Sequence, residues 1–217
     1  MKKTLILLLL SLLLTNLSAQ ELRFSVVAEP QLTWMKPDAK NVASEGSRFG
    51  INVGLQVDKF FAPNYALSSG ISIGTTGGEL QYDDELVVKI HGDDTQLPAG
   101  SVVTYKLQYI NIPLGLKLKT NPIGYSTFYA HLGLLGGVNI KATGNANSDL
   151  LSDENISDDI RLLKMGYFIG GGVEYSLGGA SSLIIGISYN NGFSDITKRE
   201  KNKATLSNVA LRLGILF

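Results

Sequence analysis

The chain contains no cysteine among its 217 residues. This absence excludes disulfide bonds, thiolate metal sites and a lipid-modified N-terminal cysteine, and it is compatible with an exported protein that folds without oxidation. The 19 basic and 19 acidic residues leave no net charge, so the composition does not indicate nucleic acid as a partner. Proline is scarce, with 6 residues, whereas glycine is frequent, with 24. Many of these glycines lie inside alternating segments, which predicts tight curvature or a crowded interior.

Beyond the N-terminus the sequence has no apolar run of the roughly 20 residues that a transmembrane helix needs. At the N-terminus, Lys2 and Lys3 precede an apolar run over residues 5–14, and the small residue Ala19 follows. This pattern predicts a cleaved signal peptide over residues 1–19 and one mature domain over residues 20–217. An uncleaved anchor is the alternative, but the apolar run is short for a membrane span. Without such a helix, the mature chain could remain in a membrane only as a closed barrel.

The C-terminal segment, residues 205–217, alternates with a period of two, as a β-strand does. One face is apolar and consists of Val209, Leu211, Leu213, Ile215 and Phe217. The other face is small or polar and carries Arg212 in its middle. This combination predicts a strand whose apolar face meets lipid and whose other face lines the inside of a barrel.

About eight segments of this kind follow one another along the chain, joined by connections that are alternately long and short. The short connections are residues 61–64, 120–124 and 178–181. Short periplasmic turns, longer external loops and an even strand number are typical of outer-membrane barrels. The predicted fold is therefore all-β, an eight-stranded antiparallel up-and-down transmembrane β-barrel in the cell outer membrane. A soluble barrel of the lipocalin type is the alternative, but glycines and charges on the more polar face favour a narrow, filled lumen.

Two details of the strand pattern need a specific explanation. Within the long insert over residues 76–101, the mainly apolar residues 86–90 are expected to pair with residues 102–105 as an external hairpin. Near Tyr109 the alternation slips, because Tyr105, Leu107 and Tyr109 are apolar on the face that is polar further along. A β-bulge at this point would restore the register.

The interior face of the predicted strands carries six charged residues: Glu29, Asp58, Lys117, Lys119, Glu174 and Arg212. Charges inside so narrow a barrel must pair with one another or with trapped water. We expect them to form an ion-pair network in which Arg212 bridges Glu29 or Glu174, since the first and last strands close the barrel. A narrow ion or proton path is the functional alternative to this structural network.

Aromatic residues concentrate toward the predicted strand ends, as expected for girdles at the two lipid headgroup levels. The girdle residues are Trp34, Phe60, Phe61, Tyr65, Tyr125, Tyr175, Tyr189, Phe193 and Phe217.

The sequence contains only two histidines, His91 in a loop and His131 in a strand. A membrane hydrolase needs a nucleophile beside a base and an orienting acid, and the face around His131 offers only Tyr129 and Gly133. We therefore predict no enzymatic activity, no catalytic residues and no cofactor. The loops around Asp83 and Asp153 are acidic, and their carboxylates are expected to be solvated rather than to bind metal, because their spacing matches no calcium loop.

The segment Tyr109-Ile110-Asn111-Ile112-Pro113-Leu114 resembles a central strand of the PorT-like outer-membrane β-barrel family, and residues 54–71 resemble the second hairpin of that family. Asn111 stands where the family often has glutamate. The resemblance covers residues 21–217 and implies a membrane-embedded barrel. Some members of the family are tied to protein secretion or gliding.

The expected function is that of a non-enzymatic outer-membrane barrel with a role in envelope structure, in adhesion or as an accessory of secretion machinery. The alternative is a narrow pore for ions or small solutes, and a hydrolase acting on lipid or peptide is third. The expected partners are outer-membrane lipid and lipopolysaccharide, other envelope proteins, and the barrel assembly machinery during insertion, because the aromatic C-terminal Phe217 resembles the signal that this machinery recognises. No nucleic acid is expected.

Overall fold

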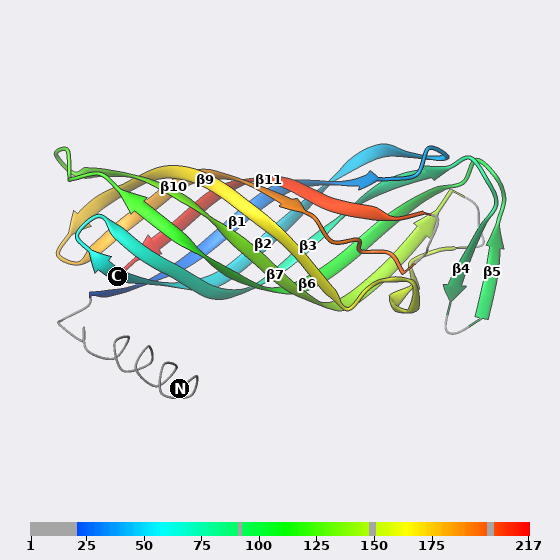
Figure 1. The fold of residues 1–217 in the computed structure, drawn as a ribbon, viewed down its shortest axis with the longest axis horizontal. Coiled ribbons are helices and arrows are strands. Elements are labelled where there is room, and N and C mark those ends of the chain that lie inside the picture. The colour runs from blue at the N-terminus through cyan, green and yellow to red at the C-terminus, as the bar shows by residue number, and fades with distance from the viewer. Residues whose placement is uncertain (1–20, 91–92, 148–150, 199–201) are drawn as a thin grey trace, which may run out of the picture.

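The computed structural model describes residues 21–90, 93–147, 151–198 and 202–217 (Figure 1). The predicted signal peptide lies outside these residues, as do His91 and part of the acidic loop around Asp153.

Eight long antiparallel strands form a closed barrel. They are β1 (Leu22–Pro37), β2 (Val42–Ala62), β3 (Tyr65–Tyr82), β6 (Val102–Lys119), β7 (Ser126–Ala146), β9 (Leu163–Gly178), β10 (Ser181–Gly192) and β11 (Ala204–Leu216). Each strand pairs with the next of the eight along the chain, and β1 pairs with β11, which closes the ring. The remaining elements are the hairpin of β4 (Leu86–Ile90) and β5 (Asp93–Leu97), the two-residue β8 (Glu154–Asn155) and the short helix η1 (Ser157–Asp159). The predicted fold class is confirmed.

The short turns and the long connections lie at opposite ends of the barrel. The C-terminus, the start of β1 and the turns after β2, β6 and β9 lie at one end, and the β4–β5 hairpin lies at the other (Figure 1). The turn after β9 depends on glycine, because Gly178 and Gly179 have φ angles of 99° and 63°, where a side chain would be strained. We call the two ends the turn end and the loop end.

Over the half of the barrel near the turn end, the outer wall is apolar. On β2, for example, Phe49, Ile51, Val53 and Leu55 are exposed, whereas Asp58 on the opposite face is buried. The other strands follow the same rule, so a continuous apolar band surrounds this half. An exposed apolar band of this extent is unfavourable in water and favourable against lipid.

Toward the loop end the two faces exchange character. On β6, Tyr105, Leu107 and Tyr109 are buried inside the barrel, and the intervening Lys106 faces outward. The expectation that a bulge near Tyr109 turns these residues outward is wrong. The register does shift at this level, but the extra residue is Ile140 on β7, since Gln108 pairs with Lys141 and Tyr109 with Asn139.

The exchange has a simple physical cause. A strand of 21 residues such as β2 is about 70 Å long at about 3.3 Å per residue, longer than a tilted strand needs to cross a bilayer. Where the barrel rises above the lipid its surroundings are water, so the apolar face belongs inside. The same strand therefore reverses its inside-to-outside pattern without changing its alternation.

The predicted pairing of residues 86–90 with residues 102–105 is also wrong. Residues 86–90 form β4 and pair with β5, so that Leu86 lies opposite Leu97. Residues 102–105 instead begin β6 and pair with β3, with Val102 opposite Gln81. The sequence of β5, Asp-Asp-Thr-Gln-Leu, has no apolar alternation, which is why periodicity did not reveal it.

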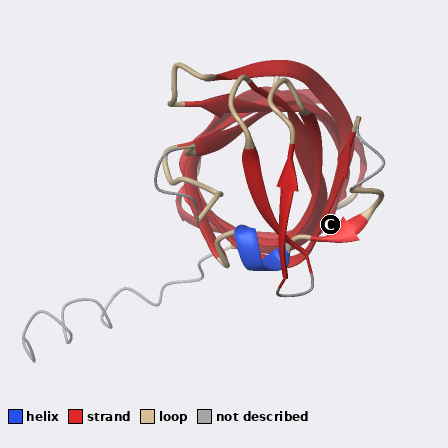
Figure 2. Cartoon of the chain, turned by 90° about the vertical axis from the view of Figure 1, so that its right-hand side faces the viewer, coloured by secondary structure: helices blue, strands red, loops and turns tan. Residues whose placement is uncertain are grey.

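A hydrophobic core fills the loop end of the barrel. Wall residues such as Met35, Leu80 and Tyr105 contribute to it together with residues of the connections: Leu86, Val88, Leu97, Leu151, Ile156, Ile160 and Ile196. The hydroxyl groups of Tyr82 and Tyr105 are hydrogen-bonded at 2.7 Å within it. Figure 2, which looks onto the loop end, shows the β4–β5 hairpin in front of the ring of strands. The connections are therefore folded onto the barrel, and we call this part the cap.

Candidate functional site

Beneath the cap, the lumen carries a buried cluster of four charges near the turn end. The Nζ atom of Lys117 lies 2.6 Å from Oδ2 of Asp58 and 2.6 Å from Oε1 of Glu174, while Nζ of Lys119 lies 2.5 Å from Oε2 of Glu174. Lys117, Asp58 and Glu174 have side chains no more than 2% exposed. The hydroxyl group of Ser68 also donates to Asp58. Because each charge has a partner of opposite sign, the cluster can be buried without an isolated charge.

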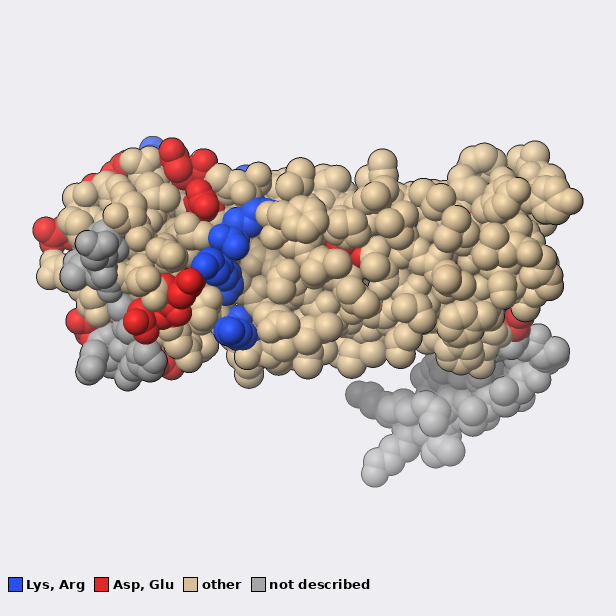
Figure 3. All heavy atoms as spheres, turned by 180° about the vertical axis from the view of Figure 1, so that it is seen from behind, with Lys and Arg blue, Asp and Glu red and all other residues tan. Residues whose placement is uncertain are grey.

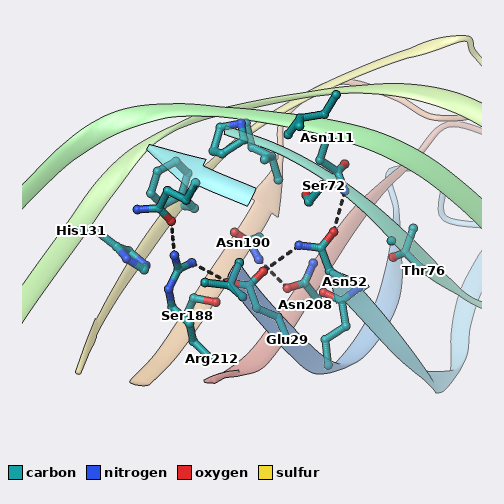
Figure 4. A pocket seen from close by; sticks show the side chains of 18 of the residues that line it. Glu29, Asn52, Ser72, Thr76, Asn111, His131, Ser188, Asn190, Asn208 and Arg212 are labelled. Carbon is teal, nitrogen blue, oxygen red and sulfur yellow. Dashed lines mark hydrogen bonds and ion pairs between the residues drawn. The ribbon is translucent and has the colours of Figure 1, made fainter. Parts of the chain in front are cut away.

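A second polar network crosses the middle of the lumen (Figure 4). Nη1 of Arg212 lies 2.6 Å from Oε1 of Glu29, and Nη2 donates to Gln56. Asn52 donates to the other oxygen of Glu29 at 2.7 Å and accepts from Asn111 at 3.2 Å. The network thus links four strands, β11, β1, β2 and β6. The pairing of β1 with β11 places Glu29 and Arg212 at the same level, since Ala28 is opposite Leu213.

The structure therefore places all six charges expected in the lumen within these two networks. Arg212 pairs with Glu29, whereas Glu174 pairs with the two lysines. The polar residues Asn52, Gln56 and Ser68 were not singled out from the sequence, although their alternate positions on the interior face signal them. Asn111 was noted only for standing where the PorT-like family often has glutamate. Lys164 was also missed, because it lies at the start of β9 next to a loop.

His131 belongs to the wall of the lumen. Its ring lies 5.6 Å from the ring of Tyr129 and 5.3 Å from that of Phe168. Gly170 on the neighbouring strand makes room for it, because a Cβ atom there would lie 2.4 Å from Nε2 of His131. Nε2 has no hydrogen-bond partner within the described residues. The same residues contain no group of three or more His, Cys, Asp or Glu side chains placed to hold a metal ion.

Between the core of the cap and the charge cluster lies a cavity of about 80 Å³. Its lining includes Glu29, Asn52, Asn111, His131, Ser188 and Arg212, which project into it from several strands (Figure 4). A cavity of this size can hold several water molecules or one small solute.

Comparison with known protein families identifies the family of the chain. Residues 13–198 match the model of the outer membrane protein beta-barrel domain. The chain belongs to this family. As a member of this outer-membrane barrel family, it lies in the outer membrane, and its apolar band is the surface that meets lipid. No helix within the described residues is long and apolar enough to cross a membrane.

Solved structures of outer-membrane proteins resemble the whole barrel, while no curated protein sequence matches the chain. The outer membrane protease OmpT from Escherichia coli superposes with a TM-score of 0.51 at 8% identity, covering 94% of this chain and 99% of that protein. Neisserial surface protein A gives a TM-score of 0.49 at 14% identity, covering 89% and 95%. OprG from Pseudomonas aeruginosa gives 0.47 at 13%, covering 91% and 97%. At such low identity these similarities concern the fold alone.

The aromatic residues of this outer-membrane barrel fall at two levels. Tyr65, Tyr125, Tyr175 and Phe217 are exposed at the turn end, and the rings of Tyr125 and Tyr175 are 6.1 Å apart. Phe61 is also exposed there and stacks on Tyr65. Toward the loop end, Phe193 is exposed, and Trp34 stacks on Tyr189 with ring centroids 6.3 Å apart. Phe60 does not belong to either level: it is buried in the lumen, with Nζ of Lys119 5.4 Å from its ring centroid.

Proposed function

We propose that this outer-membrane barrel is a closed, non-enzymatic protein that presents a folded surface outside the cell, for adhesion or as an accessory subunit of an envelope machine such as a secretion system. The observation that carries this proposal is the hydrophobic core of the cap. A barrel needs no such core to remain in a bilayer, because the apolar band alone meets the lipid. A core above the lipid serves to hold the connections in one conformation, as a recognition surface requires. The resemblance to PorT-like proteins supports a role in secretion.

The proposed closed state is supported by what fills the two ends of the lumen. At the loop end, Tyr105, Leu107 and Tyr109 are at most 2% exposed and pack against the connections. At the turn end, the ion pairs of Asp58, Lys117 and Glu174 cross the lumen. The polar cavity between them supports the alternative of a narrow pore. An ion would, however, have to pass through an apolar core, which is unfavourable.

A hydrolase is the weakest of the three proposals. Nε2 of His131 makes no hydrogen bond to a nucleophile within the described residues, and rings flank the imidazole. General-base activation of a nucleophile requires such a contact. This geometry supports a non-enzymatic role.

The outer surface supports lipid and lipopolysaccharide as partners. Figure 3 shows a band of basic side chains between the acid-rich loop end and the long wall, which carries few charged side chains. Arg48, Lys106 and Lys141 line a groove on this surface, next to the exposed Phe49. Cations directly above an apolar band lie at the level of lipid phosphates, which attract them.

The loop end itself is acidic and is the proposed recognition surface. Asp83, Asp84 and Glu85 are exposed beside the β4–β5 hairpin. A partner protein that binds here would present basic side chains, because complementary charge directs association.

Two measurements test the proposal. In planar lipid bilayers the mature protein is expected to give no single-channel currents, and stable currents would contradict a closed barrel. Cross-linking in the outer membrane, followed by purification and mass spectrometry, is expected to recover an envelope partner from wild type but not from the triple variant Asp83→Asn, Asp84→Asn, Glu85→Gln. The matched control is Glu21→Gln, which changes an exposed carboxylate at the turn end and should leave the partner bound. Recovery of the partner at equal yield from the triple variant would refute the proposal that the acidic surface binds it.

A further inference from the structure

The β4–β5 hairpin is a separate sheet of only two strands, whereas each strand of the barrel wall has a neighbour on both sides. Its residues pair from Leu86 opposite Leu97 to Ile90 opposite Asp93 without a register shift. Within the described residues, no backbone hydrogen bond joins either strand to another element. Closure into a barrel removes the edges of a sheet, so the hairpin retains what the wall has lost: strand edges with unused N–H and C=O groups.

The edge of β5 is the more accessible of the two. β4 lies beside η1, and Figure 1 shows β5 farther from the barrel than β4. The side chains of Asp94 and Gln96 on β5 are exposed. Natural sheets commonly protect an exposed edge with lysine, proline or a bulge, but β5 reads Asp-Asp-Thr-Gln-Leu and pairs regularly. An extended peptide can therefore pair with β5 along its outer edge.

The cap holds the hairpin in an extended conformation. Leu86, Val88 and Leu97 are at most 3% exposed and belong to the core of the cap. Val87, which alternates with them, is 50% exposed. A two-stranded hairpin alone is marginally stable in water, so it is this packing that keeps the strands in place. A strand that is already ordered can bind a peptide without paying again for its own ordering.

The charges around β5 determine which peptide it accepts. Residues 83–97 contain one lysine, Lys89, no arginine and five acids: Asp83, Asp84, Glu85, Asp93 and Asp94. Nε2 of Gln96 donates to Oε2 of Glu85 at 2.5 Å, which places this carboxylate next to β5. A second copy of the same strand would bring like charges together, which is unfavourable. A basic strand would instead bring opposite charges together.

We propose that an extended, basic segment of another envelope protein adds to β5 as a third strand of the hairpin sheet. Its backbone would pair with the unused N–H and C=O groups of β5, and its lysine or arginine side chains would face the acids. This inference rests on the proposed function, since it takes the cap as the place where a partner binds. It adds the conformation and the charge of the segment that is bound.

Peptide binding to the mature protein in detergent tests the strand addition. The probe is a capped peptide of about seven residues in which lysine and valine alternate, long enough to lie along the five residues of β5. The control peptide has the same sequence with a methyl group on every backbone nitrogen, so it keeps the charge but donates no backbone hydrogen bond. We expect the control to bind at least about tenfold more weakly. The bound probe should slow hydrogen exchange at the β5 amides that face away from β4 by about tenfold, and leave β10 unchanged.

Charge reversal on β5 supplies the matched variants. Asp94→Lys should weaken binding of the probe about fivefold, whereas Glu45→Lys, which reverses an exposed acid of β2 at the same end, should bind within about twofold of wild type. Equal binding of the two peptides, unchanged exchange in β5, or equal binding to the two variants would each overturn the strand addition. Recovery of the envelope partner from Asp94→Lys at wild-type yield would also overturn it and would leave the proposed function standing. Stable single-channel currents would contradict the proposed function without affecting peptide binding.

Discussion

Replacing Lys117 by methionine tests whether the charge cluster near the turn end stabilises the barrel. Lys117 is the central group, because its ammonium nitrogen contacts Asp58 and Glu174 at 2.6 Å each. Methionine retains most of the volume of the lysine chain, so the change removes the charge with little loss of packing.

The expected loss of stability depends on the ion pairs and hydrogen bonds that each carboxylate retains after the substitution. Breaking a buried ion pair by removing one partner costs about 3–5 kcal/mol, because the remaining charge is left uncompensated. Here Glu174 still has Lys119, and Asp58 still accepts from Ser68 and Gln56. We therefore expect the free energy of unfolding to fall by about 3 kcal/mol, at the lower end of that range.

The assay is equilibrium unfolding in urea with the protein in lipid vesicles. The single tryptophan, Trp34, reports on it through fluorescence, and it stacks on Tyr189 at the opposite aromatic level from the mutated cluster. Lys119→Met is the matched control. It removes one contact of Glu174 and leaves the other, and its side chain is 9% exposed, so the expected loss is about 1 kcal/mol.

Asp58→Asn supplies a second check when combined with Lys117→Met. Neutralising the acid removes the charge that the first substitution leaves unpaired, so the double variant should lose about 0.5–3 kcal/mol less than the sum of the single variants. The reasoning is refuted if Lys117→Met unfolds within about 0.5 kcal/mol of wild type, the range of ordinary surface substitutions. It is also refuted if Lys117→Met is no less stable than Lys119→Met.

Three further predictions concern the fold and are tested by urea unfolding in vesicles. Leu55→Arg, on the apolar band, should lower the free energy of unfolding by about 2–4 kcal/mol. Thr104→Arg, which faces outward on β6 but lies above the lipid, should lower it by only about 0–1 kcal/mol. Equal losses for the two variants would contradict the exchange of faces. Leu107→Ala should remove about 2–5 kcal/mol by opening a cavity in the cap, and an unchanged midpoint would contradict its burial there. Gly170→Ala should cost about 1–3 kcal/mol, and adding His131→Ala should restore only part, because the new Cβ would also lie 2.6 Å from the carbonyl oxygen of Ile187.

Several features of this protein follow from the sequence alone. The alternation in segments such as residues 49–57 predicts both a strand and the face that meets lipid, because each side chain's direction depends only on its position in the strand. The count of such segments predicts the number of strands, and the alternating long and short connections predict the end at which each turn lies. The interior position of Glu29, Asp58 and Arg212 follows from the same count of residues.

What the sequence did not determine is how high each residue lies in the barrel and what lies beside it. Tyr105, Leu107 and Tyr109 looked like a break in the pattern because lipid or water at a given level decides which face of the strand is apolar. The choice of Glu29 over Glu174 by Arg212 depends on the stagger between strands distant in sequence. The alternation of side chains is a local property of the backbone, whereas the height of a residue in the barrel and the side chains beside it are set by the closure of the barrel. Only the tertiary structure decides which charges meet.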